Sequence, residues 1–249
     1  FKQKTAYEIR LSLVGSEMCI RDSLNTSANI STGAGNILTV TNNATLRTHS
    51  NRTNGIGNAT HGVLLGSGGG NFDTTNASAT LTFNGVVSQT GGSQNLTKSG
   101  AGILALGGNN TYTGNTVVNA GTFNLLNSGS LRFVIGATGV NNQINGGGTV
   151  GLNGTFRLDL TGAGAGGSWL LVDVGPLTET FDAGFSIVDL AGGETFTESA
   201  NVWTSATYKF TEGTGILEAV PEPGAGLLLL GGLGGLLLSR GSRRRSRAL

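Results

Sequence analysis

The chain has 249 residues, among them 44 glycines and a single cysteine, and its formal net charge is +1. One cysteine provides neither a disulfide framework nor a thiolate metal site. The positive charge lies at the two ends, so the segment 24–223 carries six basic against eleven acidic groups. That segment lacks the clustered Lys and Arg that nucleic-acid binding requires, and we expect no nucleic acid as a partner.

Residues 1–23 differ in composition from everything that follows. They contain the one cysteine, Cys19, the one methionine, Met18, and a single glycine, Gly15. The segment resembles the translated sequencing-adapter read that recurs at the ends of metagenomic gene models. We therefore expect 1–23 to be a non-native leader outside the packed body.

The segment 24–157 is rich in Asn, Thr, Ser and Gly, and its apolar pieces are short. They alternate with Gly-Asn turns, a pattern typical of β-strands of three to six residues. Ile103, Leu104, Leu106 and Val117 are the expected core contributors. Similar units recur along the segment, which favours a solenoid of stacked coils over the alternative, a β-sandwich with glycine-rich loops.

One stretch, 96–123, carries the clearest motif: Leu-Thr-Lys-x-Gly-x-Gly, Leu-x-Leu-x-Gly, Asn-x-Tyr-x-Gly and Gly-Thr. It is similar to the autotransporter-associated β-strand repeat. The resemblance implies a right-handed parallel β-helix within an exported passenger. The chain lacks the C-terminal membrane-barrel pattern of true autotransporters. The matching residues are Leu96, Lys98, Gly100, Gly102, Leu104, Leu106, Gly108, Asn110, Tyr112, Gly114, Gly121 and Thr122.

The segment 158–219 has a different character, because almost all the acidic groups of the body lie in it. Longer strands are expected over 168–174, 185–190, 207–210 and 213–219. Such strands can cover the open end of a solenoid, whose edge groups would otherwise be unpaired. We expect this acidic β-region to cap the solenoid.

The segment 220–249 begins with Val220 and a Pro-Glu-Pro sequence and continues with an uncharged run of Leu, Gly and Ala over 224–239. Five arginines follow, which is the charge pattern of a transmembrane helix with a cytoplasmic end. The run of 16 residues spans about 24 Å, short of the roughly 30 Å hydrocarbon core, so a buried core helix with a basic tail is the alternative. The arginines are Arg240, Arg243, Arg244, Arg245 and Arg247.

This C-terminal arrangement resembles the PEP-CTERM sorting signal. The resemblance implies export, transient anchoring in the inner membrane by one C-terminal transmembrane helix, and processing by an exosortase-type enzyme. It also implies which residues that enzyme system would recognise: Pro221, Glu222, Pro223, Arg243, Arg244 and Arg245.

No arrangement in the sequence predicts a catalytic, cofactor or metal site. His49 and His61 are too isolated for zinc, which needs three or four compactly spaced ligands. Trp169 and Trp203 are expected in the core more than on a glycan-binding platform. The crowded acids lack a basic partner that would complete a carbohydrate-cleaving site; they are Asp159, Asp173, Asp182 and Asp189.

Together these features predict an all-β fold, a parallel β-solenoid with a capping β-region and one C-terminal transmembrane helix. The predicted function is that of a non-enzymatic exported protein of the cell surface or extracellular matrix, associated with exopolysaccharide. The alternatives are an adhesin or glycan-binding module and, less favoured, a β-helical carbohydrate-active enzyme.

Overall fold

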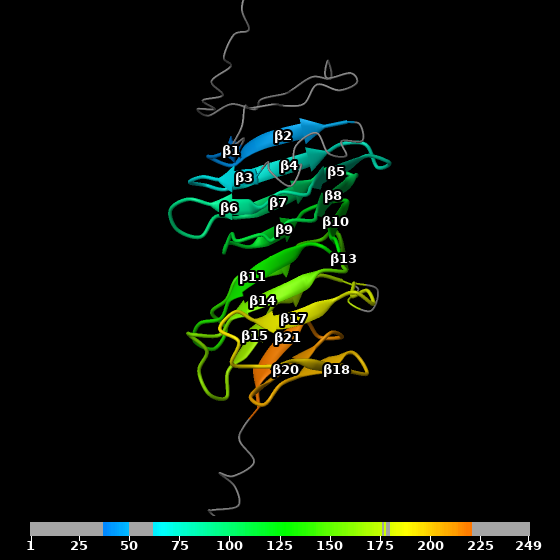
Figure 1. Cartoon of the computed structure of the whole chain (residues 1–249). Coiled ribbons are helices and arrows are strands. Elements are labelled where there is room, and N and C mark those ends of the chain that lie inside the picture. The colour runs from blue at the N-terminus through cyan, green and yellow to red at the C-terminus, as the bar shows by residue number, and fades with distance from the viewer. Residues whose placement is uncertain (1–36, 50–61, 176, 178–179, 221–249) are drawn as a thin grey trace, which may run out of the picture.

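The structure is a computed structural model that describes residues 37–49, 62–175, 177 and 180–220. These residues form an elongated stack of short parallel strands, closed at the C-terminal end by an antiparallel sheet (Figure 1). The part of the chain that the structure describes contains no α-helix. The predicted parallel β-solenoid is confirmed, and the β-sandwich alternative is wrong. The right-handed sense of the coils stays a prediction.

The solenoid has three faces, and from β3 onward each coil adds one segment to each face. The first face consists of two sheets, one with the order β1-β3-β6 and one with the order β11-β14-β17. Their strands are β1 (Ile37–Val40), β3 (Gly62–Leu65), β6 (Val87–Gln89), β11 (Ser130–Val134), β14 (Thr155–Asp159) and β17 (Ser186–Asp189).

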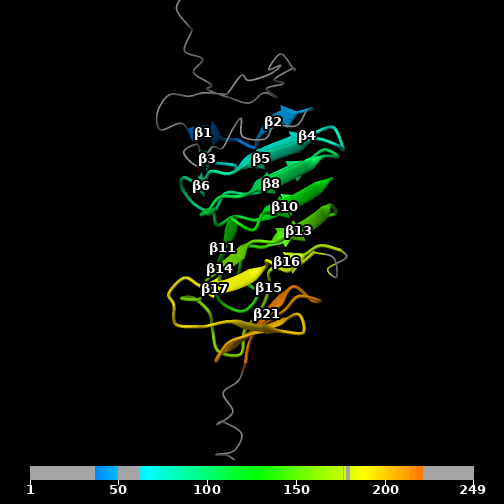
Figure 2. The ribbon, with the colours of Figure 1, turned by 45° about the vertical axis from the view of Figure 1, so that its right-hand side comes forward.

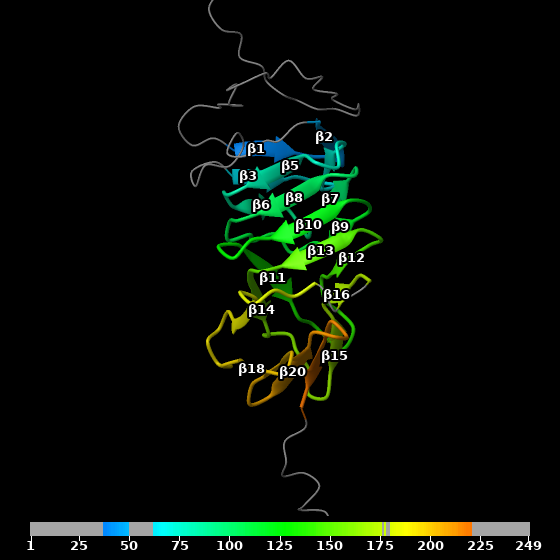
Figure 3. The same ribbon diagram turned by 90° about the vertical axis from the view of Figure 1, so that its right-hand side faces the viewer.

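The other two faces each consist of one continuous sheet, and Figure 3 shows both columns of strands. The second face contains β2 (Ala44–Thr48), β4 (Gly70–Thr74), β7 (Leu96–Ser99), β9 (Thr116–Val118), β12 (Ile144–Asn145) and β16 (Val172–Asp173). The third face, labelled along its length in Figure 2, contains β5 (Thr80–Phe83), β8 (Ile103–Leu106), β10 (Thr122–Leu125) and β13 (Thr149–Leu152).

The coils differ in length. Hydrogen bonds between equivalent side chains of successive coils join residues 26 apart near the N-terminal end, as between Asn71 and Thr45. The separation falls to 20 in the coil that contains the predicted repeat, where Leu96 of β7 is the register partner of Thr116 of β9. Near the cap it rises to 31, between Thr155 and Ser186. The strands nevertheless stay in register, so the extra residues enter the turns.

Alternation along each strand produces a continuous core. On the third face, Leu104 and Leu106 of β8 point inward and align with their counterparts in β5, β10 and β13. The inward columns are Leu81, Leu104, Phe123 and Val150, and beside them Phe83, Leu106, Leu125 and Leu152, all buried. A strand with alternate apolar residues therefore buries one face against the solenoid interior, as expected from its period of two.

Two of the four predicted core residues do not point into the core. Ile103 and Val117 are half-buried on the outer side of their strands, whereas Leu104 and Leu106 are fully buried. In β9 the inward positions belong to Thr116 and Val118. A threonine can lie inward because its hydroxyl is within 2.6 Å of the Tyr112 hydroxyl, also buried.

The C-terminal end is covered by an antiparallel sheet of β15 (Ser168–Leu170), β21 (Ile216–Ala219), β20 (Tyr208–Thr211), β19 (Val202–Thr204) and β18 (Thr197–Ser199). Its buried Phe210 packs against Phe156 of the solenoid, with ring centroids 6.2 Å apart. Phe181 and Phe185 complete the aromatic cluster. The apolar end of the last coil is thereby shielded from water.

The strands expected after residue 157 are present, but not all of them belong to the cap. β14 crosses the boundary predicted at residue 157, and β16 and β17 are still parallel strands of the solenoid. Only β15 and β18 to β21 pair antiparallel among the described strands.

Candidate interaction surface

Lys98 of the predicted repeat lies inside the solenoid. It occupies an inward position of β7, between Phe72 of β4 and Val118 of β9. Its ammonium donates hydrogen bonds to the carbonyl oxygens of Ser99 at 2.6 Å, Gly100 at 2.8 Å and Ala120 at 3.2 Å. The lysine thus joins the corner turns of two successive coils.

Burial lowers the pKa of Lys98 from 10.5 to about 8, and the carboxylate of Asp73 partly offsets this effect. A lysine with a depressed pKa can act as a base or nucleophile. Here the ammonium is already hydrogen-bonded to three carbonyl oxygens, and the side chain is fully buried. Its environment indicates a structural clamp.

Asn110 connects the two sheets of the first face. Its side-chain oxygen accepts a hydrogen bond from the backbone N–H of Val87, in β6. Its side-chain nitrogen donates to the carbonyls of Gly108 and Ser130, the latter in β11. The segment 109–113 forms no strand between them, so this buried amide supplies contacts that a regular ladder would otherwise make.

The glycines of the repeat stand where coils approach closely. A methyl group at Gly108 would overlap the backbone of Gly85, and one at Gly114 would overlap the carbonyl of Gln94. Gly100 and Gly121 have φ values of 75° and 67°, a left-handed conformation that favours glycine. The repeat motif therefore encodes the geometry of a coil, and function has to be sought among the outward residues.

The second face presents a column of outward residues, polar except for Val117, that runs the length of the solenoid. Asn71 donates to the Thr45 hydroxyl at 3.1 Å and accepts from the Ser99 hydroxyl at 2.8 Å. Asn71 thereby links β4 to both neighbouring strands on the outside of this face. In coil order the members of the column are Thr45, Asn71, Thr97, Val117, Asn145 and Asp173.

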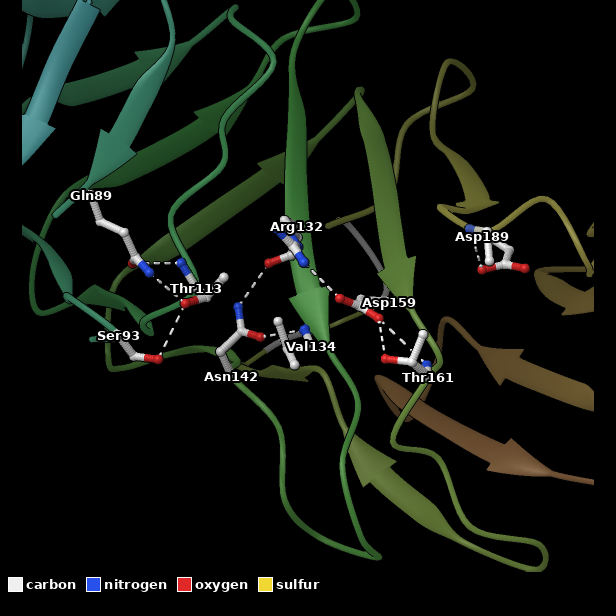
Figure 4. A network of polar contacts seen from close by, with 10 residues as sticks. Gln89, Ser93, Thr113, Arg132, Val134, Asn142, Asp159, Thr161 and Asp189 are labelled. Carbon is white, nitrogen blue, oxygen red and sulfur yellow. Dashed lines mark hydrogen bonds and ion pairs between the residues drawn. The ribbon is translucent and has the colours of Figure 1, made fainter. Parts of the chain in front are cut away.

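The second sheet of the first face carries two arginines opposite one another on its outer side. Arg132 in β11 lies opposite Arg157 in β14, and Arg157 lies opposite Val188 in β17. Arg132 donates to a carboxylate oxygen of Asp159 at 2.6 Å (Figure 4). This hydrogen bond, followed by that from Thr161, holds the pKa of Asp159 below its ordinary value.

A second polar group borders these arginines. The Asn142 side chain donates to the Arg132 carbonyl at 2.8 Å and accepts from the Val134 N–H at 2.8 Å (Figure 4). It thus fixes the end of β11. Farther along the same face, Gln89 bonds both the hydroxyl and the N–H of Thr113. The outer side of this face is consequently held rigid by side-chain contacts.

The arginine pair was missed in the sequence, although a signal exists. Arg132 lies between Leu131 and Phe133, and Arg157 lies between Phe156 and Leu158. An arginine between two buried residues of a strand must point outward. Two such triplets one coil apart place both arginines in one column, but the coil length has to be known first.

The four acids considered for a carbohydrate-cleaving site have different surroundings. Asp159 binds Arg132, and Asp189 accepts hydrogen bonds from the backbone of its own turn, at Ala191, Gly193 and Glu194. Asp173 is exposed on the second face, and Asp182 is exposed in the turn before β17.

The remaining candidates also have local roles. His49 lies 2.9 Å from the Thr75 hydroxyl, and His61 lies outside the described residues. Within the described ranges no three His, Cys, Asp or Glu side chains gather in a metal-binding group. Trp169 is buried and donates to two backbone carbonyls, as predicted for a core residue, whereas Trp203 is half-buried and donates to Glu212.

The residues predicted for sorting lie outside the described residues: Pro221, Glu222, Pro223, Arg243, Arg244 and Arg245. The predicted transmembrane helix and the leader 1–23 also lie outside them. Among the residues described, no helix has the length and apolar character needed to cross a membrane.

Comparison with known proteins supports the repeat. Residues 96–125 match the family described as Passenger-associated-transport-repeat. A segment of 56 residues is 54% identical to the Adhesin BmaC autotransporter of Brucella suis biovar 1 (strain 1330), covering 22% of this chain and 2% of that adhesin. No solved structure matches the chain. The resemblance to an autotransporter-associated repeat, predicted over 96–123, is therefore confirmed, while this chain spans a very small part of its relative.

Proposed function

We propose that this chain is part of a non-enzymatic, exported, adhesin-like protein of the cell surface or extracellular matrix. One observation carries the proposal: the residues that match the passenger-associated repeat form β7, β8, β9 and β10, in which the motif side chains fix the turns. A relative that shares such a segment is named an adhesin and an autotransporter. A stack of in-register coils keeps outward side chains at fixed spacings, which suits contact with an extended partner.

The non-enzymatic part of the proposal is supported by the match to the passenger-associated repeat and by the relative, which is named an adhesin. Catalysis of glycan cleavage needs two carboxyl groups arranged around one bond. Of the four acids that the sequence offered for such a site, Asp159 binds an arginine, Asp189 caps a turn, and Asp173 and Asp182 are exposed. A display role also agrees with the outward polar column of the second face.

For export we propose the route implied by the C-terminal sequence. The Pro-Glu-Pro motif, the apolar run and the arginines would hold the chain in the inner membrane until an exosortase-type enzyme cuts near Pro223. The apolar run is too hydrophobic to remain in water, and the arginines resist transfer across the membrane. Extracellular polysaccharide is the proposed matrix partner.

Adhesion is tested by displaying the full chain on a non-adherent bacterium and counting the cells retained on epithelial monolayers and on a polysaccharide matrix. The proposal expects several-fold more retained cells than with an unrelated displayed β-protein. If cells displaying the chain were retained no better than cells displaying the control protein, on epithelial monolayers and on polysaccharide alike, the proposal would be contradicted.

Sorting is tested separately in a host that has the exosortase, with an exosortase-deleted strain as control. Mass spectrometry of the secreted protein should find no peptide beyond about residue 223, and replacement of Arg243, Arg244 and Arg245 by glutamine should impair processing. Mature extracellular protein that retains Arg247 would exclude this route.

A further inference from the structure

Arg157 differs from the other cations of the described segments. Arg47 pairs with Asp73 at 2.7 Å, Arg132 with Asp159 at 2.6 Å, and Lys209 with Glu218 at 2.9 Å. Lys98 donates to three carbonyls. Arg157 forms no hydrogen bond or ion pair with any residue that the structure describes. It is half-buried on the outside of β14.

The residue beside Arg157 in the adjacent strand is also positively charged, which increases the need for an acceptor. Arg132 is the residue directly opposite Arg157, and adjacent strands lie about 4.8 Å apart. Like charges directly opposite one another destabilise a sheet. Asp159 neutralises one of the two guanidinium groups, and the Arg132 Nε is buried without a hydrogen-bond partner. Two arginines and one carboxylate leave a net positive charge with unsatisfied donors.

The groups around this charge suit a sugar. Two residues before Arg157 in β14, the Thr155 hydroxyl lies 2.8 Å from the Ser186 hydroxyl of β17. Residues two apart in a strand are separated by roughly 6.6 Å and point to the same side. Val188, 43% exposed, lies beside Arg157 in the next strand and adds an apolar surface. Hydroxyls, a guanidinium and a small apolar area thus lie together on one face of the sheet.

We propose that this face binds the carboxylate of a uronic acid in an extracellular polysaccharide, with Arg157 as the principal contact. A guanidinium fits a carboxylate through two parallel hydrogen bonds, and Thr155 and Ser186 are placed to bond the sugar hydroxyls. The segment 24–223 has six basic and eleven acidic groups. This segment therefore offers a polyanion no general attraction, and binding within it has to come from a local contact.

The inference rests on the proposed surface function and names its partner. The full chain is immobilised, and binding of polygalacturonate is compared with that of its methyl ester, which has the same sugar backbone without the charge. The expected result is binding of polygalacturonate alone. Arg157→Gln should weaken it at least tenfold, because the glutamine keeps the polar stem but loses the charged fork. Equal binding of the ester would overturn the proposal.

Two variants make the test specific. Lys209→Gln removes the same charge from the cap and should leave the affinity unchanged; an equal loss would mean a general charge effect and would overturn the site. Asp159→Asn frees the Arg132 guanidinium and should raise the affinity several-fold, the opposite sign to Arg157→Gln. An affinity loss in Asp159→Asn would contradict the site. Thermal melting checks that all three variants are folded.

A further arm separates the partner from the proposed function. Dextran sulfate that binds more tightly than polygalacturonate, in an Arg157-dependent manner, would overturn the assignment to a carboxylate. Cells displaying the chain that adhere normally while polygalacturonate fails to bind would disprove this site and leave the adhesin function standing. Polygalacturonate binding without cell adhesion would support this site and contradict the adhesin function.

Discussion

Lys98 determines how the stability of the solenoid depends on alkaline pH. Its pKa falls from 10.5 to about 8 on folding, so between these values the unfolded chain binds more protons than the folded chain. The free energy of unfolding therefore rises with pH across this window. Burial raises the pKa of Tyr112, so that above pH 10 the unfolded chain loses protons that the folded chain retains, and the stability falls.

We expect a stability maximum near pH 10, with a gain of about 1–2 kcal/mol over pH 8. Urea denaturation at pH 8, 10 and 11 measures it. In Lys98→Met the rise between pH 8 and 10 should vanish while the fall above pH 10 remains. A rise that persists in the variant would assign the effect to another group.

Gly114 tests how closely two coils approach. A methyl group there would overlap the carbonyl oxygen of Gln94, which belongs to the backbone and cannot move away cheaply, whereas a methyl group at Gly147 would meet nothing within 4 Å. Gly114→Ala should cost about 2–3 kcal/mol in the free energy of unfolding, and Gly147→Ala should change it by less than about 0.5 kcal/mol. Equal effects in urea titrations would mean that the coils can shift apart.

At the level of elements, the segment 109–113 joins the two sheets of the first face through Asn110. Asn110→Asp keeps the shape and loses the two donors that reach Gly108 and Ser130, so a carboxylate would face two carbonyls in a buried site. We expect a loss of roughly 3 kcal/mol or more. Asn109→Asp is the matched control, because exposed Asn109 uses only its side-chain oxygen, to accept from Ser130. Chemical denaturation of both variants measures the difference, and similar midpoints would contradict the role of Asn110.

The sequence predicted the elements better than their orientation. The stretch 96–123 revealed the β repeat because its glycines and turn residues recur at fixed distances. It did not reveal that Thr116 faces inward and Val117 outward, since a valine is ordinarily the better core residue. The Tyr112 hydroxyl reverses this preference by satisfying the threonine, and that contact requires the chain to turn a corner between them. The arginine column was not predicted for a related reason. Which residues of successive coils lie side by side depends on the lengths of the coils, and these lengths vary.

On the scale of the whole molecule, each coil touches only its neighbours, so stability spreads along the stack as a chain of interfaces. A defect in the middle weakens one interface, whereas a defect at the cap also exposes the end. We therefore expect the antiparallel cap to have two roles, to add stability and to prevent end-to-end association. The two roles can be separated by comparing buried phenylalanines of equal size in different places.

Phe210 and Phe72 provide this comparison, because both are buried completely, one in the cap and one in β4 of the second face, between β2 and β7. Phe210 contacts the rings of Phe156, Phe181 and Phe185 at the end of the last coil. Replacing either phenylalanine by alanine should cost about 3–5 kcal/mol. Only Phe210→Ala loosens the sheet that covers the apolar end, so it should form dimers or larger species under conditions where both variants are folded. Light scattering after size-exclusion chromatography measures this, with the wild-type chain in the same buffer as reference. If Phe72→Ala associates to the same extent, destabilisation alone drives the association and the cap has no separate protective role.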